Sequence, residues 1–236
     1  MSTSAGAVAL SLLVLTVPVV AHAKEQRESR EHPDLAARLS TLRTVGIVTP
    51  DVKMYELTAS NQSVLRPDWS ERGIQLVTSS VEAALREHGV AARRFTPSTA
   101  ADQEQLSEVV RLYRQVVAAV FEATFVANFP AKVARFEYSV GDLGTLLDSQ
   151  QLDGLVFTFG SGTASSGGRK ALQAVSAVFA GVASSGVDRL VVGVVDRRGD
   201  LLWFGVFAST AYDLRESDSA EEFVRALAHD LPVVKR

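Results

Sequence analysis

The chain has 236 residues, a formal net charge of −3 at neutral pH and no cysteine. The lack of cysteine excludes disulfide bonds, zinc sites with cysteine ligands and catalysis by a thiol. Nucleic-acid binding needs a basic face, and neither sign of charge is gathered into a long block, so no nucleic-acid partner is expected.

Residues 1–23 have the features of a secretory signal peptide. They are mostly apolar and contain no charged side chain, although a basic residue is usual near the start. Pro18 precedes Ala21-His22-Ala23, which places small residues at the spacing that signal peptidase recognises. We therefore expect cleavage after Ala23 and a periplasmic or secreted protein. The alternative is an uncleaved anchor, for which the apolar run is short because a spanning helix needs about 20 residues.

Cleavage would leave 213 residues (236 minus 23), a length that suits one domain with a sizeable core. No cysteine follows the apolar stretch, so neither a lipid anchor nor a transmembrane span is expected after cleavage. Residues 24–41 form a charged lead-in, predicted to be mobile or a short helix. Residues 42–236 are predicted to form a single α/β domain.

Strands and helices alternate along the first part of this domain. Short segments at 44–48, 90–95 and 154–159 are predicted to be strands, and the alternation of apolar and polar side chains along 51–57 indicates a half-exposed extension or an edge strand. Apolar side chains at three- and four-residue steps predict helices from Pro67 to Gly89, from about Asp102 to Pro130, and over 140–150. The run 154–159 is nearly all apolar, as expected for a strand that is covered on both faces.

A hairpin is predicted near the end of the chain. The apolar runs Leu190–Val195 and Leu201–Phe207 flank a polar turn in which Gly199 can adopt a positive φ. A final helix is expected over 219–230. The fold class is therefore α/β: a mixed sheet flanked by helices, with a late antiparallel β-hairpin.

The hairpin carries a family resemblance. Its sequence around Asp196, Gly199 and Trp203, with a helix opened by Trp69 upstream, resembles exported bacterial envelope proteins similar to the amino-terminal domain of TolB and to the curli-secretion protein CsgG. The resemblance implies structural roles for these four residues. It also implies an α/β domain that acts by assembly or binding and brings no catalytic residues with it.

A serine hydrolase would need serine, histidine and an acid brought together. The part of the chain after residue 23 offers His32, His88 and His229, the last two near predicted helix ends, where histidines usually are solvated or interact with the helix dipole. Ser161 lies in Gly160-Ser161-Gly162, which lacks the Gly-x-Ser-x-Gly elbow found in many hydrolases. We therefore expect no hydrolase site.

Metal binding is not expected either, because no pair of histidines has ligand spacing. An acidic cluster precedes and opens the last predicted helix: Asp213, Glu216, Asp218, Glu221 and Glu222. Acidic side chains at a helix start interact favourably with its dipole, and Ser217 or Ser219 could cap that helix. We favour this capping interpretation over a metal site, because it does not require further metal ligands that the sequence does not offer.

A Gly/Ser-rich segment is the most suggestive candidate for a binding site. We expect it to be a loop between the 154–159 strand and a helix over 169–179. Its small residues and two cations could surround an anion with backbone N–H groups: Gly160, Ser161, Gly162, Ser165, Ser166, Gly167, Gly168, Arg169 and Lys170. The segment is neither a Walker loop nor a Gly-x-Gly-x-x-Gly turn. The alternative is a flexible surface loop without a ligand.

Two functional classes follow from the sequence. The first is a non-enzymatic envelope protein that binds a partner or assembles with copies of itself. The second is an anion- or small-molecule-binding protein, or an enzyme, that uses the Gly160 to Lys170 segment. No cofactor is expected in either class.

Overall fold

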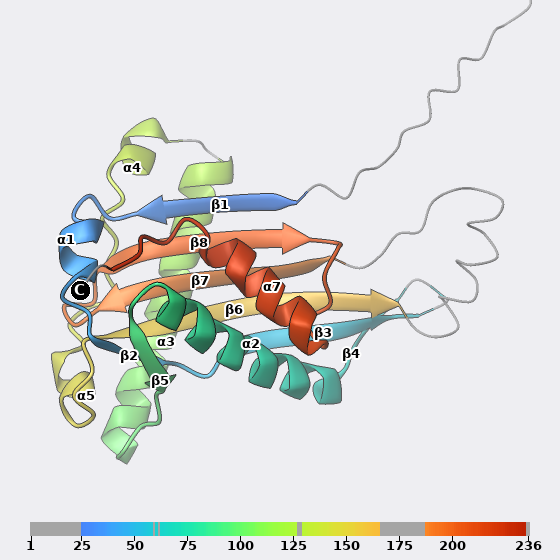
Figure 1. Cartoon of the computed structure of the whole chain (residues 1–236), viewed down its shortest axis with the longest axis horizontal. Coiled ribbons are helices and arrows are strands. Elements are labelled where there is room, and N and C mark those ends of the chain that lie inside the picture. Colours follow the sequence, from blue (N-terminus) through green and yellow to red (C-terminus); the bar gives the residue numbers. More distant parts are fainter. Residues whose placement is uncertain (1–24, 59, 61, 127–128, 166–186, 235–236) are drawn as a thin grey trace, which may run out of the picture.

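The computed structural model describes residues 25–58, 60, 62–126, 129–165 and 187–234. Within them, a mixed eight-stranded sheet carries helices on both faces and is not closed into a barrel (Figure 1). The strands are β1 (Gln26–Glu31), β2 (Thr44–Ile47), β3 (Asp51–Leu57), β4 (Ser63–Leu65), β5 (Ala91–Arg94), β6 (Gly154–Ser165), β7 (Asp188–Asp196) and β8 (Leu201–Ser209). The predicted fold class is confirmed.

The helices are α1 (Leu35–Leu39), α2 (Pro67–Glu87), α3 (Ala100–Phe121), α4 (Pro130–Ala134), α5 (Gly144–Asp148) and α7 (Ser217–Ala228), with a π-helical turn, η1 (Glu122–Val126), after α3. Proline begins α2, where its missing N–H costs nothing, and Gly89 follows the end of α2 with a φ of 82°. A capping box between Thr99 and Asp102 begins α3. Among the described helices, none combines the length and hydropathy needed to span a bilayer.

Strand β6 is the central element of the sheet. The main strand order is β1-β8-β7-β6-β2-β5, and β2 and β3 lie end to end along the same side of β6. The strands β2, β3 and β6 are parallel, whereas β7, β8 and β1 add successive antiparallel neighbours. The outer strand β4 pairs with the end of β3.

Each face of the sheet has its own apolar core. On one face, α1, α2 and α7 cover residues such as Val156, Val192 and Trp203 (Figure 1). On the other face, α3 and α5 cover Phe157 and Phe204 among others. Because successive side chains of β6 point to opposite faces, the strand contributes residues to both cores, as its apolar sequence predicts.

The charged lead-in differs from the expectation. It does contain a short helix, α1, but its charged first half is strand β1, which pairs with β8 along six residues, Gln26 to Glu31. Residues 26–31 are all polar and show no alternation in hydropathy, so this segment becomes a strand because it pairs with β8. As an edge strand, it carries charges that oppose pairing with further strands.

Two predicted helices differ in their bounds. The long helix does not continue to Pro130, because α3 ends at Phe121 and is followed by η1, while Pro130 begins α4. The helix expected over 140–150 is shortened to α5. The helix expected over 169–179 lies outside the described residues.

The predicted hairpin is confirmed as β7 and β8. Gly199 has a φ of 80°, and its N–H donates to the carbonyl oxygen of Asp196 at 2.9 Å. One carboxylate oxygen of Asp196 accepts the N–H groups of Arg198 and Asp200, and the other accepts from the guanidinium of Arg38. Asp196 and Gly199 therefore shape the turn.

Candidate functional site

The predicted Gly/Ser-rich loop is wrong in its first half. Gly160, Ser161 and Gly162 lie inside β6, which continues to Ser165 and pairs with β3 on one side and with β7 on the other. Their N–H groups are thus not free to converge on a phosphate. The remaining predicted binding residues, Ser166, Gly167, Gly168, Arg169 and Lys170, lie outside the described residues.

Packing explains the glycines of this strand. A Cβ atom at Gly160 would collide with the side chain of Leu190, and one at Gly162 would collide with Met54 and with the carboxylate of Asp188. Only glycine lets these neighbours approach β6 so closely.

Asp188, the first residue of β7, is buried on the α2 side of the sheet. Its carboxylate accepts the backbone N–H of Thr163 at 3.1 Å and that of Leu214 at 2.9 Å. Burial raises the pKa of this carboxyl to about 7, an effect that the two N–H groups oppose. The side chain thereby ties the end of β6 and the turn before α7 to the start of β7.

The other face of the same strands is open. Ser161 pairs directly with Lys53 of β3 and with Arg189 of β7, so these three side chains point to the α3 side in one row. All three are exposed. Neither Lys53 nor Arg189 makes an ion pair with any residue that the structure describes. We call Lys53, Ser161 and Arg189 the basic row.

A second row continues this open face toward the end of the sheet. Leu65 pairs with Tyr55, Tyr55 pairs with Thr163, and the N–H of Val187 donates to the hydroxyl of Thr163 at 2.8 Å. Leu65 and Val187 are 47% and 45% exposed, so each end of this row carries an exposed apolar residue. We call these four residues the apolar row, and the two rows together the open sheet end.

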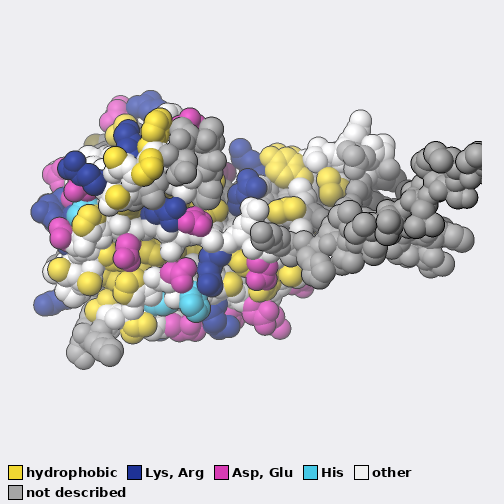
Figure 2. Space-filling view, turned by 90° about the horizontal axis from the view of Figure 1, so that it is seen from above, with side chains coloured by type: hydrophobic (Ala, Val, Ile, Leu, Met, Phe, Trp, Pro, Cys, Tyr) yellow, Lys and Arg dark blue, Asp and Glu magenta, His cyan; other side chains and the backbone are white. Residues whose placement is uncertain are grey.

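Figure 2 shows the molecule from above the view of Figure 1. Hydrophobic, basic and acidic side chains are all visible toward the end of the molecule where β3 and β6 end. A hollow of about 280 Å³ adjoins the basic row on its inner side and is lined by Asp51, Lys53, Arg114, Val117, Phe159 and Gly160. In it, Arg114 forms an ion pair with Asp51 and lies 4.7 Å above the ring of Phe159.

Two solved structures that are similar to this chain are dodecamers of PelC from Paraburkholderia phytofirmans. The first is 12% identical, with a TM-score of 0.40, and the match covers 90% of this chain and 99% of that chain. The second, a leucine-to-methionine variant, is 10% identical, with a TM-score of 0.38, and the match covers 90% of this chain and 100% of that chain. No protein-family model matches the chain, and no curated protein matches its sequence.

Two of the three histidines after residue 23 have polar side-chain contacts in the described part of the chain. His32 accepts the N–H of Asp34 and contacts Arg38, His88 follows the end of α2, and His229 contacts Asp230 after the end of α7. In the described part of the chain, none of the hydrogen bonds of these histidines reaches a serine.

The acidic cluster before and within α7 does not form a metal centre. Among the described residues, no three His, Asp or Glu side chains converge as metal ligands. The expected serine cap is wrong: α7 begins at Ser217 without a side-chain cap, and the hydroxyl of Ser219 accepts the N–H of Asp213 instead. Asp213 itself binds Arg215 through both carboxylate oxygens.

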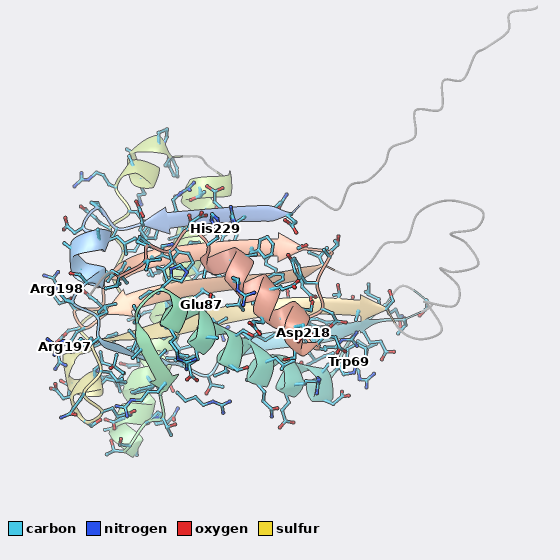
Figure 3. The ribbon with its side chains drawn as sticks, viewed as in Figure 1. Trp69, Glu87, Arg197, Arg198, Asp218 and His229 are labelled. Carbon is cyan, nitrogen blue, oxygen red and sulfur yellow. The ribbon has the colours of Figure 1, made fainter. Side chains whose placement is uncertain are left out.

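Trp69 lies near the start of α2, at the end of the molecule opposite Arg197 and Arg198 (Figure 3). Its half-buried indole is held between two guanidinium groups, with Arg66 4.4 Å and Arg215 4.1 Å from the ring centre. The guanidinium of Arg66 also donates two hydrogen bonds to the carboxylate of Asp68, which lowers the pKa of that carboxyl. These contacts join α2 to the turn before α7, in line with a structural role for Trp69.

Proposed function

We propose that this protein is a non-enzymatic exported protein that acts by binding a partner, either another envelope protein or further copies of itself, through the open sheet end. The observation that carries the proposal is the juxtaposition of the basic and apolar rows on one face. Within the described residues, no helix covers these two rows, whereas helices cover the central strands on both faces of the sheet.

The composition of the open sheet end supports this use. Sheets in globular domains normally bury their apolar side chains against another layer. Contiguous exposed apolar side chains next to basic and aromatic ones are typical of interaction surfaces. Here Leu65 and Val187 flank Tyr55 and Thr163 in one row, and the cations lie beside them.

Charge placed in the apolar row should abolish association. We expect the double substitution Leu65→Asp and Val187→Asp to convert an assembled wild type into monomers in light scattering, because two carboxylates replace the apolar surface that the interface would bury and must lose their hydration there. Leu112→Asp is the matched control, since Leu112 on α3 is 48% exposed and lies outside the open sheet end. If the wild type is monomeric, the same variants are compared in cross-linking to envelope proteins. Association that is equal in the wild type and the double variant would refute the proposal.

Export is the second part of the proposal. We expect the mature protein to begin at Lys24, two residues before β1, and to be recovered from the periplasm or the medium. Intact-mass measurement of the protein from its native host tests this directly. Ala23→Phe should block processing, because the cleavage site requires a small residue. A wild-type mass that includes residues 1–23 would contradict cleavage.

A further inference from the structure

The basic row places two cations on either side of one hydroxyl. Adjacent strands are about 4.8 Å apart, so the Cα atoms of Lys53 and Arg189 lie roughly 10 Å apart with Ser161 between them. Both side chains are long enough to reach a group that sits above Ser161. Without such a group, two like charges face each other across a single strand with no carboxylate between them.

The surroundings of the row are positive. Arg114 reaches the adjoining hollow from α3, and Asp51 is the single acid among the residues that line it. Three cations, Lys53, Arg114 and Arg189, against one carboxylate leave a local charge of +2. The nearby acid Glu56 lies on the opposite face and binds Arg66. Asp188 also lies on that opposite face and is buried.

We propose that the basic row and the hollow beside it bind a phosphate group carried by a ligand of the envelope. A phosphate monoester brings about two negative charges and the phosphodiester of a lipid headgroup brings one, and both offer acceptor oxygens that match two cations and a hydroxyl donor. A guanidinium binds such a group through two parallel hydrogen bonds, while an ammonium acts as a point charge. The half-exposed Phe159, beneath Arg114, gives the hollow an apolar wall for the remainder of the ligand.

This inference rests on the proposed function in one respect, because both use the open sheet end. It concerns different side chains, however, and binding of free phosphate needs no second protein. The basic row and the apolar row can therefore be tested separately on the same purified protein.

The test is a titration with inorganic phosphate at constant ionic strength, followed by calorimetry and by the melting temperature. We expect saturable binding to the wild type and at least a tenfold weaker affinity in Lys53→Gln/Arg189→Gln. The matched control is Arg94→Gln/Lys132→Gln, which removes two exposed cations outside the open sheet end and should bind as the wild type does. A second arm uses flotation with phosphatidylglycerol vesicles, compared with neutral phosphatidylcholine vesicles.

Binding of free phosphate without flotation would assign a small soluble ligand, and flotation that depends on the two cations would assign a lipid headgroup; both support the inference. Equal phosphate affinity in the wild type and in Lys53→Gln/Arg189→Gln, or no saturable binding in either arm, would overturn it. If Leu65→Asp/Val187→Asp still abolishes association in that case, the proposed function stands and only the phosphate site is wrong.

Discussion

Replacing Trp203 by alanine is expected to lower the free energy of unfolding by about 3–5 kcal/mol. Trp203 lies on β8 with 1% of its surface exposed, in the core beneath α2 and α7. Its indole lies across Gly205 on the same strand, where any Cβ atom would collide with the ring. It also lines an apolar cavity of about 20 Å³, which truncation would enlarge. Because domains are stable by only about 5–15 kcal/mol, this loss should be readily measured by denaturant unfolding.

Trp69→Ala is the matched control for this prediction. Trp69 is half-buried, so its truncation removes less apolar contact and two cation–π interactions of about 0.5–1 kcal/mol each. The midpoint of Trp203→Ala should therefore fall well below that of Trp69→Ala. A midpoint for Trp203→Ala equal to that of the wild type would show that the indole is not part of the core.

Local sequence patterns predicted the parts of the fold that local interactions specify. The hairpin of β7 and β8 follows from two apolar runs around Gly199, and α2 follows from its apolar periodicity between Pro67 and Gly89. In these elements the residue propensities, the hydropathy pattern and the turn residues all indicate the same structure. Strand β1 could not be found in this way, because its six polar residues become a strand only by pairing with β8.

The candidate site was harder to predict than the fold. Glycine and serine are typical of loops, so the sequence predicts a loop where β6 continues, whereas the glycines there accommodate Leu190, Met54 and Asp188. The basic row joins positions 53, 161 and 189, and their proximity depends on the register of three strands that are distant in sequence. The one available signal was the alternation along 51–57, which indicated that a face of this strand would be exposed.

The stability of the protein is expected to fall as the pH rises from about 5 to 8, because of Asp188. Burial raises the pKa of this carboxyl from 3.8 to about 7, with a smaller contribution from the negative charge of Asp213 and an opposing one from Arg215. The folded state then binds a proton that the unfolded state has already released, so stability decreases with pH in this window. Between pH 5 and pH 8, the change should be about 2–3 kcal/mol.

Denaturant unfolding of the wild type and of Asp188→Asn across this pH range isolates the effect. The asparagine has no proton to lose, so the stability of the variant should lack this pH dependence; it also offers one acceptor where the aspartate offers two, so one hydrogen bond is lost. The pKa values of Asp68 and Asp230 are lowered by their partners, so these carboxyls titrate below the window and affect both proteins equally. The difference in unfolding free energy, wild type minus variant, should therefore grow as the pH falls from 8 to 5. A difference that stays constant over this range would show that Asp188 is already ionised in the folded protein, with its charge stabilised by the N–H groups of Thr163 and Leu214.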